Sequence, residues 1–363
     1  MRVAIVHDWL NQMGGAERVL ETLIEMFPGA PVYTSMYWPE GMPGQYRNWD
    51  IRTTWMDHLP GIHRNHQPYL LLYPLAFGGL ELEGYDLVIS NKSAFCLGVR
   101  TSPQARHVCY CLTPTRFVWD FETYVHREQV NGMARRMVKP FIAWLRRWER
   151  RAADRVDAFV AISREVHSRV QRFYDSESAI IYPPVDTERF AAASGGHSQD
   201  YFLIVSRLIP YKRIDLAVRA FNQLGLPLWI AGDGRDRESL EAIAGPSVRF
   251  LGRVPDAELG DLMAGCRAFV FPGLEDFGIA PVQAMAAGRP VIAFEGGGAT
   301  DYVVEGVTGA FFREQTPEAL AETVRTFDAT SVDPPVIRAH AQKFDTGVFK
   351  TQLWAFVQEV LRD

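Results

Sequence analysis

The sequence PGLEDFGIAPVQAMAAGRPVIAF, residues 272–294, decides the fold because it predicts a strand–loop–helix–strand unit. The apolar run Ala268–Phe271 directly before it is typical of a buried strand that ends at a Pro-Gly loop. An Ala- and Met-rich helix is expected over Ile279–Ala287, and Val291–Phe294 is expected to form the next strand. Units of this kind build parallel sheets, so an α/β fold is predicted.

The loop of this unit carries its candidate chemistry. Ligands of open α/β sheets bind at the carboxyl ends of strands, where the amides and the positive dipole end of a helix N-terminus suit a phosphate. Here those amides belong to Phe277–Ala280. Glu275 lies just before them, where it could accept hydrogen bonds from sugar hydroxyls. The alternative is an ordinary helix start with two solvated acids, Glu275 and Asp276.

Length and composition limit the other possibilities. The chain has 363 residues, which predicts two domains at about 150 residues each. A net charge of −5 gives no sign of nucleic-acid binding. Four cysteines without C-x-x-C spacing favour a reduced cytosolic setting and no zinc. The first apolar run is too short for a signal peptide and no run approaches the ~18 residues of a spanning helix, so any membrane contact is expected to be peripheral.

The first half of the chain predicts a second parallel sheet, which starts with a strand at Val3–Val6 and a helix at Ala16–Phe27. Gly14 and Gly15 at the intervening turn could bring backbone amides near an anion or a sugar, or could form a plain turn. The dinucleotide fingerprint G-x-G-x-x-G is absent from this loop.

Residues 131–155, NGMARRMVKPFIAWLRRWERRAADR, hold eight Arg or Lys and two acids. After Pro140 the spacing of the apolar residues predicts a helix over Phe141–Arg155 with an apolar stripe and a basic flank. Such a helix can lie on an anionic membrane with its tryptophans at the headgroup level. It could equally be a core helix with a solvated basic face.

Domain boundaries follow from breaks in the pattern. Pro183 and Pro184 continue neither a strand nor a helix, so residues 1–182 are expected to form the N-terminal domain and 183–200 a linker. Residues 201–345 would form the C-terminal domain and 346–363 a last helix.

Two cations follow the first strand expected in the second half, Tyr201–Ser206. Arg207 and Lys212 stand five residues apart in a loop at the carboxyl end of that strand. The planar fork of Arg and the point charge of Lys can together clamp a diphosphate. Isolated, such a pair would more often be solvated.

The run E-x-F-G-I followed by x-A-M-A-x-G-x-P-V-I-A resembles the nucleotide-sugar site of family 4 retaining glycosyltransferases. The resemblance covers nearly the whole chain and is specific in the second half. It implies the GT-B fold, in which two Rossmann-like doubly wound domains face each other across a cleft. It also implies that the C-terminal helix crosses back to the N-terminal domain, which would bind the acceptor.

The resemblance implies a role for individual residues. Arg207 and Lys212 would hold the donor diphosphate, and with Glu275, which would orient the sugar, they are the catalytic candidates because positive charge stabilises the leaving diphosphate. The full set of implied donor-binding residues is Gly14, Gly15, Arg207, Lys212, Val254, Glu275, Phe277, Gly278, Ile279 and Gln283. Val254 would contact the base through its backbone.

Two positions depart from the family pattern. The family motif has a second Glu, which accepts hydrogen bonds from the ribose, where this chain has Gln283. Bacterial members often have a His near the sugar or acceptor where this chain has Leu112, which cannot donate a hydrogen bond. His7 and His126 could replace that His by residue type alone.

The closest resemblance is to bacterial mannosyltransferases of polysaccharide and O-antigen assembly. It implies transfer of mannose from GDP-mannose to a saccharide or lipid-linked acceptor in surface polysaccharide synthesis, in the cytoplasm or on the inner face of the plasma membrane. No Asp-x-Asp motif is present, so neither a metal nor another cofactor is expected. Leu112 and Gln283 leave a non-catalytic binding or scaffold protein as an alternative, and a nucleotide-sugar epimerase shares the fold.

Overall fold

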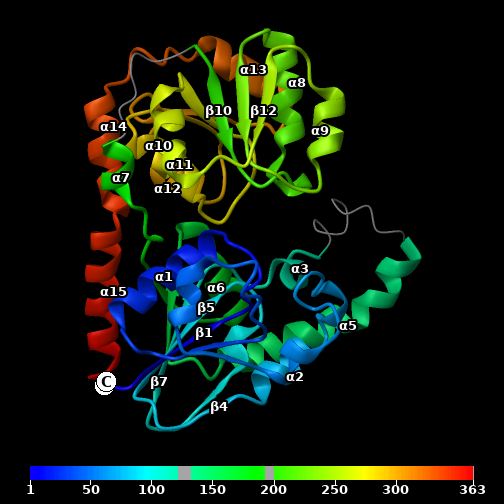
Figure 1. The fold of residues 1–363 in the computed structure, drawn as a ribbon, viewed down its shortest axis with the longest axis vertical. Coiled ribbons are helices and arrows are strands. Elements are labelled where there is room, and N and C mark those ends of the chain that lie inside the picture. Colours follow the sequence, from blue (N-terminus) through cyan, green and yellow to red (C-terminus); the bar gives the residue numbers. More distant parts are fainter. Residues whose placement is uncertain (122–131, 193–199, 363) are drawn as a thin grey trace. The chain divides into compact units, whose positions relative to one another are not determined.

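The computed structural model describes residues 1–121, 132–192 and 200–362, with the side chains of 132–137 left out (Figure 1). The chain divides into two compact units. Unit 1 is Met1–Tyr182 with Phe349–Asp363, and unit 2 is Pro183–Val348. Each unit is built on a parallel β-sheet with helices on both faces.

The main sheet of unit 1 has seven parallel strands in the order β3-β2-β1-β5-β7-β8-β9. Its strands are β1 (Val3–His7), β2 (Val32–Thr34), β3 (Ile51–Thr53), β5 (Leu87–Lys92), β7 (Arg106–Cys111), β8 (Ala158–Ala161) and β9 (Ser178–Ile180). Two short strands, β4 (Glu81–Leu82) and β6 (Arg100–Thr101), pair separately. The winding of the chain reverses between β1 and β5, and open α/β sheets bind their ligands at the carboxyl ends of the strands at such a point.

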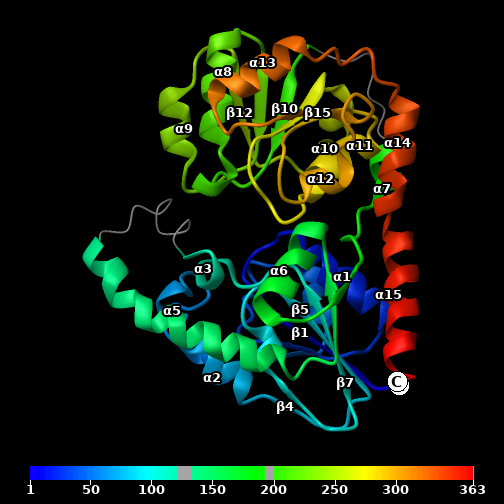
Figure 2. The ribbon, with the colours of Figure 1, turned by 180° about the vertical axis from the view of Figure 1, so that it is seen from behind.

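The helices of unit 1 cover both faces of that sheet. They are α1 (Gly15–Met26), α2 (Tyr73–Gly78), α3 (Arg116–Trp119), α5 (Gly132–Ala153), α6 (Arg164–Tyr174) and α15 (Thr346–Val360), with 3₁₀ turns η1 (Gly44–Asn48), η2 (Trp55–His58), η3 (Gln67–Tyr69) and η4 (Cys96–Gly98). Figures 1 and 2 show α2 and α5 on one side of the strands and α1 and α15 on the other. Tyr73 and Phe77 of α2 share an apolar core with Ile142 and Leu145 of α5.

The last helix, α15, packs on unit 1. Phe349 meets the ring of Tyr110 edge-on at 5.5 Å, and Nζ of Lys350 lies 2.7 Å from Oε2 of Glu25. The C-terminal residues therefore return to the first unit, as the GT-B resemblance implies.

Helix α5 corrects one expectation. Its residues 132–153 run without a break through Pro140, where the sequence predicted that the helix begins. Proline is tolerated inside a helix at the cost of one backbone hydrogen bond, which packing can offset. The apolar residues Ile142 and Leu145 bury this helix against the sheet, and Phe141 and Trp148 pack partly against the same core.

Unit 2 has six parallel strands in the order β12-β11-β10-β13-β14-β15. They are β10 (Phe202–Val205), β11 (Leu228–Ala231), β12 (Val248–Gly252), β13 (Ala268–Phe271), β14 (Val291–Phe294) and β15 (Gly309–Phe312). Strand β15 was not predicted; its sequence GAFF begins with a glycine, which is unfavourable in strands. The predicted strands Ala268–Phe271 and Val291–Phe294 are confirmed as β13 and β14.

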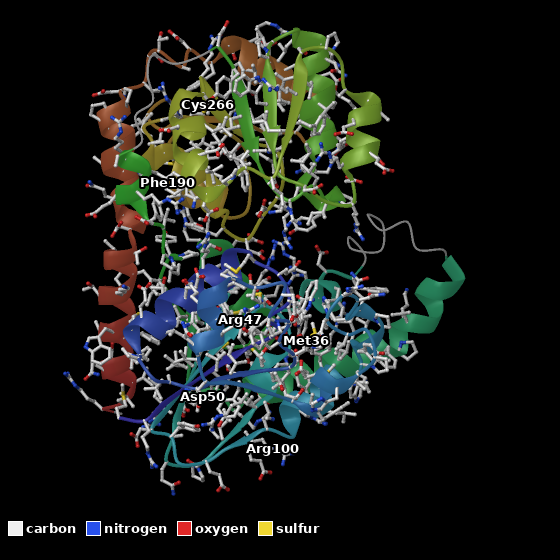
Figure 3. All side chains as sticks on the ribbon, in the orientation of Figure 1. Met36, Arg47, Asp50, Arg100, Phe190 and Cys266 are labelled. Carbon is white, nitrogen blue, oxygen red and sulfur yellow. The ribbon has the colours of Figure 1, made fainter. Side chains whose placement is uncertain are left out.

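The helices of unit 2 are α7 (Thr187–Ala191), α8 (Ile214–Leu224), α9 (Arg237–Ile243), α10 (Asp256–Gly265), α11 (Ile279–Ala286), α12 (Ala299–Tyr302), α13 (Pro317–Thr326) and α14 (Pro334–Ala341), with 3₁₀ turns η5 (Pro210–Lys212) and η6 (Gln342–Phe344). Figure 1 shows α8 and α9 on one side of the strands and α10 and α11 on the other. Helix α7 lies inside 183–200, the segment expected to be a linker. Its Phe190 is buried in unit 2 (Figure 3).

Candidate functional site

The candidate residues of unit 2 lie at the carboxyl edge of its sheet, where β10 and β13 pair in parallel. From β10 the chain proceeds to β11 and β12 in one direction, and from β13 to β14 and β15 in the other, so the winding reverses at this pair. Open α/β sheets bind their ligands at such a point. The loop after β10 carries Arg207 and Lys212, and the loop after β13 carries Glu275.

Lys212 and Glu275 form an ion pair across these two loops. Nζ of Lys212 meets Oε2 of Glu275, and 13% and 14% of the two side chains are exposed. Lys212 ends the 3₁₀ turn η5, and Arg213, with a φ of 54°, then leads the chain into α8. Because the pair is largely shielded from water, its charges interact more strongly than at an open surface.

Two glycines allow the loops to approach so closely. A Cβ at Gly273 would lie 2.9 Å from the carbonyl oxygen of Lys212, and a Cβ at Gly297 would lie 2.1 Å from that of Glu275. Gly297 also has a φ of +57°, which glycine adopts readily. The amide of Gly298 donates to the Glu275 carbonyl at 2.9 Å. The backbones of Gly273 and Gly297 therefore lie too close to those of Lys212 and Glu275 for a side chain to fit between them.

Helix α11 begins directly after this carboxylate. Phe277 is buried, and its carbonyl accepts a hydrogen bond from the hydroxyl of Tyr302 at 3.1 Å. Gly278 is the N-cap, with a φ of 93°, and Ile279 is the first helical residue. The positive end of the helix dipole therefore follows Glu275 within a few residues. A cation, a carboxylate and a helix N-terminus together suit a ligand that has both phosphates and hydroxyls.

The other predicted residues of unit 2 lie on the same helix or on loops at the same edge. Gln283 is half-buried on the second turn of α11. Arg207 is exposed and forms no ion pair with any residue in the described part of the chain. Val254 is half-buried in the loop between β12 and α10, and β12 is separated from β10 by β11.

Gly14 and Gly15 lie in unit 1, at the start of α1. Gly14 is the N-cap, and a Cβ there would come within 3.1 Å of Oε2 of Glu17. Glu17 is buried, and its Oε1 lies 3.3 Å from Nε2 of His7. The helix start that we expected to face an anion therefore has a carboxylate beside it, contributed by its own first turn.

Asn91 sets the tautomer of His7, its neighbour across β1 and β5. Nδ2 of Asn91 donates to the carbonyl oxygen of Ala16 at 2.8 Å and lies 3.2 Å from Nδ1 of His7. Because Nδ2 is a donor, Nδ1 of His7 accepts, and Nε2 carries the proton towards Glu17. Sequence reasoning identified His7 by type but missed Glu17 and Asn91. Asn91 is the second-last residue of β5, and Glu17 lies in the first turn of the helix that follows β1.

Leu112 follows β7 and is buried, while His126 lies outside the described residues. Within the described ranges, no group of three or more His, Cys, Asp or Glu side chains could hold a metal ion. No helix in that same part of the chain is long and apolar enough to cross a membrane.

Two family models match the chain. "Glycosyltransferase Family 4" covers residues 13–189, and "Glycosyl transferases group 1" covers residues 186–330. Together these models cover residues 13–330, and the chain is a glycosyltransferase. This glycosyltransferase has the GT-B fold. The first matched segment contains every strand of the seven-stranded sheet except β1, and the second contains the whole six-stranded sheet.

Individual relatives agree with this assignment. The chain is 25% identical over 337 residues to mouse alpha-1,3/1,6-mannosyltransferase ALG2, which covers 81% of this chain and 77% of that protein. It is 28% identical over 205 residues to the GDP-mannose-dependent alpha-(1-6)-phosphatidylinositol monomannoside mannosyltransferase of Mycolicibacterium smegmatis, which covers 48% of this chain and 54% of that protein. The second match therefore spans about half of either protein.

A solved structure shows the same fold over the full length of the glycosyltransferase. Anabaena HepE in complex with UDP superposes with a TM-score of 0.72 at 17% identity, covering 99% of this chain and 100% of that one. At this identity the likeness concerns the fold. The predicted GT-B architecture is thereby confirmed.

Helix α5, for which membrane contact was expected, has a buried face and an exposed face. Most of the predicted apolar stripe of α5 packs on the core of unit 1. Trp144 remains 41% exposed, and the exposed Arg147 and Arg151 follow it at helical spacing. The exposed face of α5 therefore carries basic residues and Trp144.

Proposed function

We propose that this glycosyltransferase moves mannose from GDP-mannose to a saccharide or lipid-linked saccharide acceptor, with retention of anomeric configuration, in bacterial surface polysaccharide synthesis. The observation that carries the proposal is the Lys212–Glu275 ion pair at the switch point of unit 2, just ahead of the N-terminus of α11. Mannose is favoured because ALG2 and the mycobacterial enzyme are both named as mannosyltransferases, the latter as GDP-mannose-dependent.

The ion pair supports different roles for its two members, with Lys212 binding the diphosphate and Glu275 binding the sugar. A diphosphate at this edge competes with Glu275 for Nζ of Lys212, and the helix N-terminus and Arg207 add positive potential. Once its cation is shared with the diphosphate, the carboxylate of Glu275 can accept hydrogen bonds from sugar hydroxyls. As the bond from the anomeric carbon to the phosphate oxygen breaks, negative charge grows on the diphosphate, where preorganised positive groups stabilise it most.

This division assigns charge neutralisation to the protein's own groups. We therefore expect transfer to proceed without a metal or other cofactor and to continue in excess EDTA. Loss of activity in EDTA that Mg²⁺ or Mn²⁺ restores would contradict this part of the proposal.

A panel of GDP-, UDP-, ADP- and dTDP-sugars tests the donor. Thermal shift identifies the nucleotide that stabilises the protein, and incubation with the radiolabelled sugar nucleotide then distinguishes the activities. Transfer or hydrolysis of GDP-mannose supports the proposal. An isomerised sugar nucleotide would instead indicate an epimerase, and binding without chemistry would indicate a scaffold. UDP-sugars belong in the panel because the HepE structures contain UDP and UDP-glucose.

We also propose that α5 contacts an anionic membrane surface from the cytoplasmic side. The exposed Trp144 and the basic residues at positions 147 and 151 support it, since tryptophan favours the headgroup region and arginines favour anionic lipids. A lipid-linked acceptor would then lie near the enzyme.

A further inference from the structure

A buried Lys–Glu pair lies in unit 1, and no motif in the sequence indicated it. Lys92 is the last residue of β5 and is fully buried, and Glu149 of α5 has 2% of its side chain exposed. Nζ of Lys92 lies 2.8 Å from Oε1 of Glu149. Burial opposes the charge on Lys92, but the adjoining Glu149 outweighs this effect and raises the pKa of Lys92, so Lys92 keeps its charge.

Glu149 gathers hydrogen bonds from three segments. Its Oε1 accepts from the amide and the hydroxyl of Thr115, at 3.1 and 2.7 Å, and from the hydroxyl of Tyr174 at 2.6 Å. Its Oε2 accepts from Nε1 of Trp119 at 2.9 Å. Lys92 in turn donates to the carbonyl oxygen of Thr113 at 2.9 Å.

Apart from the bond from Tyr174, these hydrogen bonds involve one loop. Residues 112–119 follow β7, which pairs with β5, and they comprise a short connection and helix α3. The amide of Leu112 donates to the carbonyl of Lys92 at 2.8 Å, and Nε of Arg146 donates to the carbonyl of Val118 at 2.8 Å. The loop thus lies at the carboxyl edge of the sheet, one strand from the switch point between β1 and β5.

A buried ion pair adds little to the stability of a protein, because hydrophobic residues of similar volume often give the same stability or more. Here the two charged groups fix the conformation of a loop, since the ammonium and the carboxylate each form hydrogen bonds with polar groups of residues 112–119. An apolar pair would leave the Thr115 amide, the Trp119 indole and the Thr113 carbonyl without these partners.

We propose that Lys92 and Glu149 are a positioning pair that holds loop 112–119 in the conformation that receives the saccharide acceptor. The inference rests on the proposed transferase function, because the carboxyl edge of the first domain is the acceptor side of that reaction. Neither residue touches the acceptor, and both act through the loop.

The test compares three variants of the full-length protein. Lys92→Met alone leaves a buried carboxylate without its cation and is expected to lower the melting temperature. Lys92→Met with Glu149→Gln removes both charges but keeps one carbonyl acceptor, and should recover most of that loss. Arg100→Met with Glu81→Leu is the matched control, because that pair is 3.6 Å apart and 63% and 65% exposed.

Two readouts separate positioning from plain stability. In the double variant, hydrogen exchange of a peptide covering 112–119 should accelerate at least tenfold while peptides of β1 and β2 stay protected. KM for the acceptor should rise about tenfold, with affinity for GDP unchanged within twofold. Unchanged loop exchange, or an unchanged acceptor KM despite faster exchange, would overturn the proposal.

A fourth variant, Trp119→Phe, tests the proposal even if the double variant misfolds. Trp119→Phe removes one donor to Glu149 and leaves the ion pair intact, so a smaller rise in acceptor KM is expected at near-normal stability. No rise in this variant would count against the proposal. If the wild-type protein transfers no sugar from any donor, the proposed function fails, and the exchange measurement still decides whether the pair holds the loop.

Discussion

Nζ of Lys212 contacts Oε2 of Glu275, and the two side chains join the loops after neighbouring central strands of unit 2. We assign these residues to different parts of one donor, the diphosphate and the sugar. In the absence of a donor, the two side chains neutralise each other's charge. A bound donor must replace this ion pair with its own contacts to Lys212 and Glu275. The first two predictions follow from this exchange.

Arg207→Ala and Lys212→Ala should each weaken GDP binding ten- to hundredfold, because a charged hydrogen bond contributes about 1.5–3 kcal/mol. Isothermal titration calorimetry measures the affinity. Arg219→Ala, which removes an exposed arginine of α8, is the control and should bind normally. Wild-type affinity in both site variants would exclude the diphosphate clamp.

Glu275→Gln should reduce sugar transfer strongly and leave GDP affinity equal or higher, because Lys212 is released from its carboxylate partner. Steady-state transfer rates and calorimetry with GDP give the two quantities. Glu295→Gln changes an exposed carboxylate after β14, paired with Arg313, and serves as the control. Parallel losses of transfer and of GDP affinity would remove Glu275 from the sugar site.

Gln283→Glu should raise the affinity for GDP by roughly 1 kcal/mol, because a charged acceptor binds ribose hydroxyls more strongly than a neutral one. Gln283 keeps one carbonyl acceptor but has a donor NH₂ in place of the second oxygen. Calorimetry on both proteins decides. Weaker binding would mean that a neighbour repels the carboxylate, and unchanged binding that position 283 does not contact the nucleotide.

Trp144→Ala combined with Arg147→Gln should reduce sedimentation of the protein with anionic vesicles. Wild-type binding should weaken at high salt, since ions screen exposed charges. Trp354→Ala, which removes a similarly exposed tryptophan from α15, should bind like wild type. Failure of the wild-type protein to bind anionic vesicles at low salt would contradict membrane contact through α5.

The stability of the protein should fall between pH 7.5 and pH 5 because of His107. Burial lowers the pKa of this side chain to about 4, against 6.5 in an unfolded chain. As the pH falls below 6.5, His107 binds a proton in the unfolded state but stays neutral in the folded state. Stability is thus complete above pH 6.5 and is lost towards pH 4, by about 2 kcal/mol at pH 5.

Urea unfolding at the two pH values measures this loss. His107→Gln should flatten the dependence, whereas His58→Gln, at an exposed position, should leave it unchanged. Equal pH dependence in wild type and His107→Gln would show that His107 does not titrate in this way.

Local pattern determined the fold class. Apolar runs bounded by Gly and Pro marked β13 and β14, because a buried parallel strand must be apolar throughout and must stop where the backbone turns. The motif around Glu275 then implied the GT-B fold, which the structure and the comparisons confirm. The residues assigned to the donor remain predictions, since their roles await the experiments above.

Contacts between distant segments were decided by the tertiary structure. Sequence reasoning placed Lys212 and Glu275 in one site but gave them separate partners. It assigned no role to Lys92 or to Glu149. Which side chains meet depends on strand order and on how closely two loops can approach each other. Gly273 allows a close approach because a Cβ at this position would collide with the backbone of Lys212. Pro140 stays inside α5 for the same reason, because the packing of the helix on the sheet outweighs a local preference that sequence alone can register.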